Sequence, residues 1–148
     1  ACSKNTAIRS ARARAGMTVV LDTHAWVWWA TADRRLSRRA SQIIQRAVRG
    51  GGVAISMISI WEVAKKVEKQ QLVFDRPVRD WIDRATALPG LSLIELTPAI
   101  LIDSCSLPQP FHGDPADQII VATARHHHAT LVSKDGKLKS YVHVQTVW

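Results

Sequence analysis

Short apolar runs alternate with amphipathic segments in the first part of the chain. Residues 18–21 (TVVL) form an apolar run that predicts a buried strand, and residues 23–30 (THAWVWWA) predict a helix. Apolar positions then recur on one helical face in residues 36–48, before three glycines and the short apolar run at residues 53–56 (VAIS). The pattern therefore predicts a strand and a helix, followed by a second helix and a second strand.

The same alternation continues to the end of the chain, with prolines and glycines at several boundaries. We predict further helices in residues 59–72, 78–88, 98–107 and 115–127. We predict further strands in residues 91–96, 129–133 and 141–147, the last of them at an edge of the sheet.

The order of these elements indicates an α/β fold. Strands that alternate with helices, and that are apolar along most of their length, are typical of a parallel sheet covered by helices on both faces. With 148 residues, of which 47% are hydrophobic and 22% charged, the chain is long enough for one domain with a sizeable core. Ligand sites in such sheets form beyond the carboxyl ends of the strands, so functional residues are expected there.

The net charge is distributed unevenly. The chain carries +8, but residues 1–16 contribute four basic residues and no acid, which leaves 16 basic against 12 acidic residues, a net +4, in residues 17–148. A mildly basic domain is compatible with a nucleic-acid partner without requiring one.

Residues 1–16 have three possible origins: a flexible RNA-binding arm, a transit-like segment, or sequence left over from cloning or upstream translation. Because Met17 directly precedes a strand, we favour the last. We expect residues 1–16 to be a disordered or non-native extension and residues 17–148 to be the domain.

Cysteine content and hydropathy argue against several classes. Cys2 and Cys105 cannot make a disulfide framework, and neither has a Cys or His neighbour at zinc-ligand spacing. No apolar run approaches the roughly 20 residues that span a bilayer, and the N-terminal segment lacks the apolar centre of a secretion signal. We therefore expect a cytoplasmic protein that does not contact a membrane.

Four carboxylates occupy positions that a parallel sheet can bring together. Asp22 ends the first strand, Asp135 follows the fourth, and Glu62 lies one turn into the helix after the second. Asp117 begins the helix before the fourth strand, which normally starts at the opposite end of the sheet. The long connection at residues 107–115 (LPQPFHGDP) is able to return the chain to the carboxyl ends.

The segment HGDPADQIIVATA, residues 112–124, has two interpretations. Asp114 suits a helix N-cap, Pro115 the first helical position and Asp117 the third, where negative charge meets the positive end of the helix dipole. However, the residues three, four and seven positions after Asp117 are apolar, so Asp117 shares a face with residues expected to be buried. A capping role alone does not explain that placement.

Each of the other acids also has a purely structural account. Asp22 suits an N-cap, Glu62 the partner of Ser59 in a capping box, and Asp135 a turn with Gly136. Four acids at one end of a sheet would, however, repel one another and raise their own pKa values unless a cation neutralised them. Oxygen ligands alone suit Mg²⁺ or Mn²⁺, and such an ion supports hydrolysis of phosphodiester bonds.

The four segments that carry these acids are VVLDTHAWVWW, AISMISIWEVAKK, HGDPADQIIVATA and LVSKDGKL. In this order and spacing they resemble the PIN-domain ribonucleases of the VapC toxin type. One segment alone is weakly specific, whereas the four in order are specific, and the resemblance covers nearly all of residues 17–148. It implies a PIN-like three-layer α/β fold, with a mostly parallel five-stranded sheet of order 3-2-1-4-5 and helices on both faces.

The resemblance also implies a set of site residues. The carboxylates around Mg²⁺ or Mn²⁺ would be Asp22, Glu62, Asp117 and Asp135, with Asp114 as an auxiliary acid. We assign Ser133 and Thr23 to substrate binding. Two positions depart from the family: Gln118 stands where Arg is frequent, which removes a charge beside the site, and Ser133 stands where Thr is frequent, which preserves a hydroxyl.

The function implied by the resemblance is that of a metal-dependent endoribonuclease, the toxin of a type II toxin–antitoxin pair. Its substrate would be structured RNA such as tRNA or rRNA, and its partners a small VapB-like antitoxin and a second copy of the chain in a homodimer. Two alternatives stay open: a nuclease of the same fold that processes RNA without an antitoxin, and a non-catalytic RNA-binding module.

Other residues that suggest chemistry have more ordinary interpretations. The six tryptophans are expected to fill the core or a subunit interface rather than stack on RNA bases. Residues 126–128 are three consecutive histidines, which point in different directions on a helix, so we assign them no ligand role. The basic residues of the helices are expected to form solvated faces and could guide RNA toward the acids.

Overall fold

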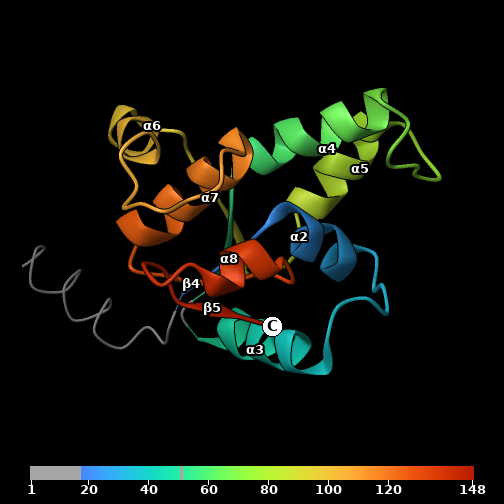
Figure 1. Cartoon of the computed structure of the whole chain (residues 1–148). Coiled ribbons are helices and arrows are strands. Elements are labelled where there is room, and N and C mark those ends of the chain that lie inside the picture. The colour runs from blue at the N-terminus through green and yellow to red at the C-terminus, as the bar shows by residue number, and fades with distance from the viewer. Residues whose placement is uncertain (1–17, 51) are drawn as a thin grey trace, which may run out of the picture.

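A parallel five-stranded sheet lies at the centre of the computed structural model, which describes residues 18–50 and 52–148 (Figure 1). Its strands are β1 (Val19–Leu21), β2 (Val53–Ser56), β3 (Leu91–Ile94), β4 (Thr130–Val132) and β5 (Thr146–Val147). Their order is β3-β2-β1-β4-β5, and every neighbouring pair is parallel. The expected α/β class and strand order are confirmed, whereas the extension expected at residues 1–16 lies outside the described residues.

Seven helices surround the sheet within the described ranges. They are α2 (Thr23–Ala30), α3 (Arg38–Arg49), α4 (Ile58–Glu68), α5 (Val78–Thr86), α6 (Pro98–Ser104), α7 (Pro115–His126) and α8 (Gly136–Ser140). No helix in this part of the chain has both the length and the apolar character needed to cross a membrane.

The central strand β1 separates two hydrophobic cores because its side chains alternate between the two faces of the sheet. Val19 and Leu21 belong to a core built with α2, α3 and α5, whereas Val20 belongs to a core built with α6, α7 and α8. Figure 1 shows α3 on the side of the sheet away from α6 and α7. The layers are helix, sheet and helix, as expected.

Several predicted elements are shorter than expected; the helix predicted at residues 98–107, for example, ends at Ser104. Two of these differences have a clear physical reason. The helix expected at residues 59–72 ends at Glu68, because the chain turns through a left-handed conformation at Gln70, where φ is 57°. The edge strand expected at residues 141–147 is only Thr146–Val147. The side chain of Tyr141 is instead buried in the α6–α7 core, which draws the start of this segment away from the sheet.

One helix was not expected. The turn predicted at Asp135 and Gly136 is the start of α8. The Asp135 carboxylate accepts a hydrogen bond from the backbone N–H of Lys137 (2.8 Å), and Leu138 is 1% exposed in the core. One cap and one buried leucine therefore hold a helix too short to give a periodic signal in the sequence.

The tryptophans give a test of the core. Trp26 is fully buried, its ring lies edge-on to Trp81, and its Nε1 donates to the carbonyl of Ala85 (3.1 Å). We expect Trp26→Ala to lower the free energy of unfolding by about 3–5 kcal/mol. Trp61 is 56% exposed, so Trp61→Ala is expected to change it by about 0.5 kcal/mol or less. Urea unfolding measures both, and equal losses would contradict this account of the core.

Candidate active site

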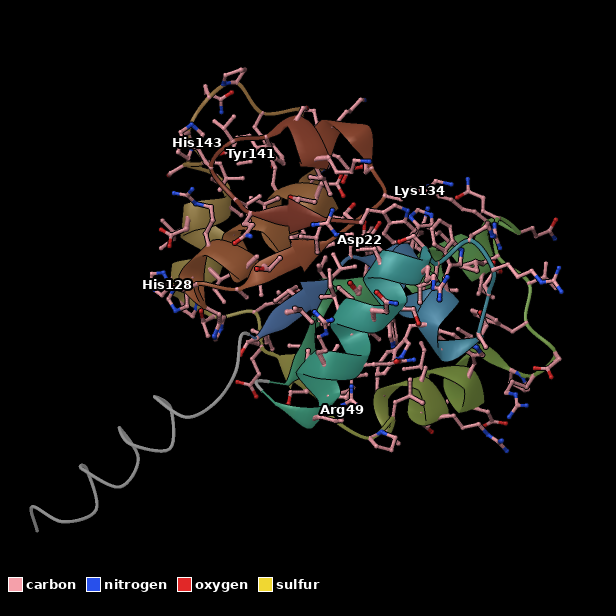
Figure 2. All side chains as sticks on the ribbon, turned by 90° about the horizontal axis from the view of Figure 1, so that it is seen from below. Asp22, Arg49, His128, Lys134, Tyr141 and His143 are labelled. Carbon is pink, nitrogen blue, oxygen red and sulfur yellow. The ribbon has the colours of Figure 1, made fainter. Side chains whose placement is uncertain are left out.

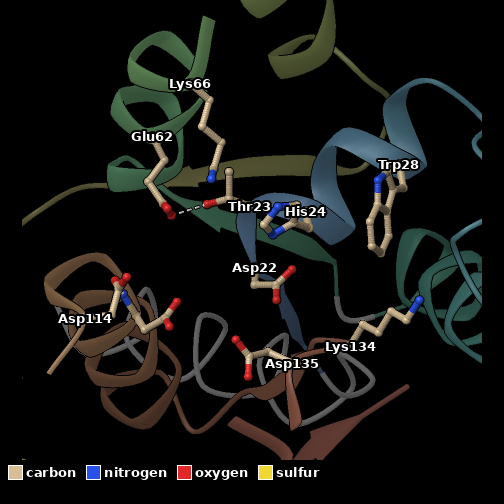
Figure 3. Close-up of a pocket in the computed structure, with 10 residues that line it drawn as sticks. Asp22, Thr23, His24, Trp28, Glu62, Lys66, Asp114, Lys134 and Asp135 are labelled. Carbon is tan, nitrogen blue, oxygen red and sulfur yellow. Dashed lines mark hydrogen bonds between the residues drawn. The ribbon is translucent and has the colours of Figure 1, made fainter. Parts of the chain in front are cut away.

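The candidate acids lie around one pocket of about 350 Å³ beyond the carboxyl ends of β1 and β4 (Figure 3). All five carboxylates singled out in the sequence line it: Asp22, Glu62, Asp114, Asp117 and Asp135. They come from the end of β1, from α4, from the start of α7 and from the segment after β4. The connection before α7 therefore returns the chain to the strand ends, as the sequence analysis required.

Three of these carboxylates are also helix N-caps. Asp22 accepts a hydrogen bond from the backbone N–H three residues later at the start of α2 (2.8 Å), and Asp114 does the same for α7 (3.0 Å). Asp135 caps α8. The capping interpretations of Asp22 and Asp114 are confirmed, and they coexist with a place in the pocket. The N-termini of three helices meet there, and their free N–H groups favour negative charge.

Asp22 is the most buried of the acids, with 6% of its surface exposed. Its pKa is raised from 3.8 to about 6, mainly by burial. Hydrogen bonds from Ser133 and the α2 backbone oppose the rise, and the neighbouring carboxylates of Asp117 and Asp135 contribute to it. The carboxyl group is thus held in a place that disfavours its own charge. A cation in the pocket would reverse that preference.

Ser133 connects two of the acids. Its hydroxyl donates to Asp22 Oδ2, and its oxygen accepts from the backbone N–H of Asp135 (3.0 Å). The side chain is fully buried and does not line the pocket. Its assignment to substrate binding stays a prediction. Its contacts show a hydroxyl that holds the Asp22 carboxylate and the backbone of Asp135 in place.

Thr23 holds Glu62 in a similar way. The Thr23 hydroxyl donates to Glu62 Oε1 (2.5 Å), the contact drawn in Figure 3, and is also hydrogen-bonded to Ser59 Oγ (3.0 Å). The capping box considered for Ser59 and Glu62 is wrong, because α4 is preceded by Met57 and has no side-chain cap. Glu62 instead lines the pocket, and partial burial raises its pKa. The role of Thr23 in substrate binding also stays a prediction.

The start of α7 adds a residue that the sequence analysis missed. His112 Nε2 lies 2.7 Å from Asp117 Oδ2, and both side chains are about one-fifth exposed. Partial burial raises the pKa of Asp117, the contact with His112 opposes that rise, and Asp114 and Asp135 add to it. The only signal in the sequence was the position of His112 in the loop that carries the acids.

The remaining lining residues are cationic or aromatic. Lys66 lies one turn after Glu62 on α4, and Lys134 directly precedes Asp135 (Figure 3). Neither makes a salt bridge to another described residue, whereas Lys65 pairs with Glu68. Both ammonium groups therefore remain available for a ligand's negative charge.

Trp28 forms part of the pocket wall beside these cations. It belongs to the core, as expected for a tryptophan. Two cations also lie over its ring: the Lys134 ammonium is 5.8 Å and the Arg35 guanidinium 5.1 Å from the ring centroid. His24 lies 5.7 Å from the same ring, and burial, with Lys66 nearby, lowers its pKa. The Arg35 guanidinium is paired with the Asp33 carboxylate (2.8 Å), so the Lys134 ammonium is the cation of this wall that makes no salt bridge to a described residue.

The donor set of the pocket fits a hard divalent cation in its chemistry, because the candidate ligands are all carboxylate oxygens. In residues 18–50 and 52–148, no three Asp, Glu, His or Cys side chains lie close enough together to hold one ion. Mutual repulsion of unneutralised carboxylates favours this separation.

Comparison with known proteins identifies the class. The family model described as the PIN domain matches residues 19–143, and the chain belongs to this family. It is 37% identical to Ribonuclease VapC22 of Mycobacterium tuberculosis (strain ATCC 25618 / H37Rv) over 133 residues. This alignment covers 88% of this chain and 98% of that protein. The resemblance in the four sequence segments is confirmed.

Solved structures agree on the fold. VapBC2 from Rickettsia felis, bound to a DNA fragment from its promoter, matches with a TM-score of 0.66 and 18% identity, over 88% of this chain and 98% of that chain. FitAcB from Neisseria gonorrhoeae matches with a TM-score of 0.61 and 17% identity, over 88% and 96%. A toxin–antitoxin complex from Klebsiella pneumoniae matches with a TM-score of 0.59 and 22% identity, over the same shares.

The raised pKa of Asp22 predicts how stability depends on pH without divalent metal. The cost of ionising this buried carboxyl group is absent below about pH 4 and complete above about pH 6. The free energy of unfolding is therefore expected to fall as the pH rises through this range. Asp22→Asn keeps the cap but has no charge, so its free energy of unfolding at about pH 8 is expected to exceed that of the unmodified chain by up to about 3 kcal/mol.

The measurement is urea unfolding in EDTA across this pH range. The gain from Asp22→Asn is expected to shrink toward zero at about pH 4. Asp103→Asn, which removes an exposed carboxylate of α6, is the control and is expected to show no such trend. A gain from Asp22→Asn that does not vary with pH would contradict the account of a buried, destabilised carboxylate.

Proposed function

We propose that this chain is a divalent-metal-dependent endoribonuclease and the toxin of a type II toxin–antitoxin pair, acting on structured RNA such as tRNA or rRNA. The observation that carries the proposal is the convergence of five carboxylates from four parts of the fold on one pocket, beside two lysines that make no salt bridge to a described residue. Membership of the PIN-domain family and 37% identity to a protein named as a ribonuclease support it.

Asp22, Glu62, Asp117 and Asp135 would hold Mg²⁺ or Mn²⁺, with Asp114 as an auxiliary acid. When bound, such an ion lowers the pKa of an attacking water and offsets charge on the phosphoryl group. Ser133 and Thr23 keep the carboxylates of Asp22 and Glu62 oriented, and His112 does so for Asp117. These fixed hydrogen bonds reduce the reorganisation needed when substrate binds.

Lys66 and Lys134 are suited to bind RNA. Each lines the pocket, and an ammonium that makes no salt bridge within the described residues can contact a phosphate. Gln118 contributes no positive charge beside Asp117 and does not line the pocket. The two lysines therefore supply the positive charge that binds the RNA backbone next to the acids.

The proposed partners follow from relatives rather than from the pocket. The structural neighbours include complexes named as VapBC and as toxin–antitoxin, which supports a small VapB-like antitoxin as the partner of this chain. We also propose a homodimer. The exposed Trp61 on α4 is one candidate contact for such a surface.

Metal removal tests the chemistry. Purified chain incubated with total RNA is expected to cleave it in Mg²⁺ or Mn²⁺, to stop in EDTA, and to resume when the ion is returned. Gel electrophoresis of the RNA measures this. Cleavage that persists in EDTA would exclude the metal-dependent mechanism, and intact RNA in every tube would favour the binding module.

The two acids at the start of α7 are expected to fail differently. Asp114→Ala removes a helix cap, so its free energy of unfolding is expected to fall by about 1 kcal/mol and its melting temperature to fall with it. This variant is expected to keep part of its cleavage activity. Asp117→Asn keeps the shape and removes a charge, so it should hold its stability in EDTA and lose nearly all cleavage. Equal cleavage by Asp117→Asn and the unmodified chain at saturating ion would remove Asp117 from the site.

Growth tests the toxin assignment. Induced expression of the chain in a bacterium is expected to stop growth, because cleavage of essential RNA stops translation. Asp117→Asn is expected to be tolerated, and co-expression of the small protein from an overlapping upstream reading frame should restore growth. Normal growth with the unmodified, soluble and active chain would favour the RNA-processing nuclease that needs no antitoxin.

A further inference from the structure

A second cavity, of about 440 Å³, lies beside the acidic pocket. It forms between the end of the 107–115 connection and the C-terminal segment after β4. The residues that shape it are Phe111, His112, Lys137, Ser140, Tyr141 and His143. Neither the family match nor the proposed hydrolysis assigns this cavity a role.

Aromatic rings form its wall. The Phe111 ring stacks on the His112 ring, with centroids 4.4 Å apart and planes at 25°, and meets the Tyr141 ring edge-on at 4.8 Å. The Tyr141 ring lies 5.3 Å from that of His143. Tyr141 is fixed because it is buried and its hydroxyl donates to the carbonyl of Pro108 (2.8 Å). A fixed aromatic wall of this kind suits a flat, π-faced ligand.

Two contacts connect residues that line the cavity with residues that line the acidic pocket. His112 lines the cavity with its ring while its Nε2 contacts Asp117, which lines the acidic pocket. At the start of α8, Lys137 lines the cavity and its backbone N–H donates to Asp135, another acid of the pocket. Figure 2 shows Tyr141 and His143 on one side of this C-terminal helix and Lys134 on the other.

Charge distinguishes the two sites. No carboxylate lines the cavity, and the Lys137 ammonium makes no salt bridge to a described residue. A ligand that suits it has a flat aromatic part and a negative group. A nucleotide meets both requirements, whereas an apolar side chain of a protein partner would leave the lysine unused.

We propose that this cavity binds one nucleotide of the RNA substrate next to the scissile bond, with its base against Phe111 and His112 and its phosphate near Lys137. The inference rests on the proposed function, since it names a substrate contact of that nuclease. Phe111 and Lys137 are thus binding residues. They determine which nucleotide is accepted beside the scissile bond and take no part in its hydrolysis.

The experiment measures binding without cleavage. The ¹⁵N-labelled full chain in EDTA is titrated with each of the four ribonucleoside 5′-monophosphates to millimolar concentration, and with ribose 5-phosphate as the probe that has no base. Backbone signals of Phe111, His112, Lys137 and residues 141–143 are expected to shift with nucleotides and much less with ribose 5-phosphate.

Two pairs of variants sharpen the test. Lys137→Gln is expected to weaken nucleotide binding by about two- to fivefold, whereas Lys139→Gln, an equal loss of charge at an exposed position on the same helix, should leave it unchanged. Phe111→Leu keeps apolar packing but loses the aromatic face, and is expected to weaken binding by about tenfold or more. Phe111→Trp should restore it, which a purely structural role would not predict.

Three outcomes would overturn the proposal. The first is that the nucleotides do not shift the signals of these residues. The second is that ribose 5-phosphate shifts them as much as the nucleotides do. The third is that Lys137→Gln and Phe111→Leu leave nucleotide binding unchanged. Because the titration requires no hydrolysis, nucleotide binding without nuclease activity would refute only the proposed function. Metal-dependent cleavage without nucleotide binding would refute only the proposal for this cavity.

Discussion

The structure depends on how it accommodates one buried carboxylate. Asp22 ends the central strand of the sheet, where water cannot stabilise its charge fully, and burial of such a group is unfavourable unless it is paired or hydrogen-bonded. The first turn of α2 and a serine that follows β4 donate to it. The first contact is local, whereas the serine reaches Asp22 because β4 lies next to β1 in this strand order. The sheet topology and the pocket therefore depend on each other, and the remaining unfavourable charge makes the pocket suitable for a cation.

Much of this arrangement could be predicted because the sequence signals were local. Apolar runs bounded by glycines and prolines predicted the strands and their buried environment. Asp22 and Asp114 were predicted to be caps because N-caps depend on contacts within three residues. The convergence of the acids could also be predicted, since parallel strands share one edge for their carboxyl ends, and the resemblance to the PIN-domain family pointed to the same residues.

The features that were missed depend on contacts between distant residues or on very short elements. Thr23 is hydrogen-bonded to Ser59 and Glu62, which lie 36 and 39 positions later in the sequence. The spacing of Ser59 and Glu62 is that of a capping box, but this capping box does not form. The five residues of α8 cannot show helical periodicity, and their helix depends on one buried leucine and one cap. The contact between His112 and Asp117 depends on the path of a loop, which no periodic pattern reveals.

The double use of three aspartates as pocket acids and helix caps limits how the sequence can evolve. An N-cap needs a short side chain whose oxygen reaches the backbone N–H groups of the first turn, and Glu is not among the residues that serve well. Exchange of one acid for another, which preserves charge, is therefore restricted at Asp22, Asp114 and Asp135, whereas Glu62 caps no helix and escapes this restriction. At the three caps, selection for folding and selection for the charge of the pocket act on the same carboxylate groups, so neither can relax alone.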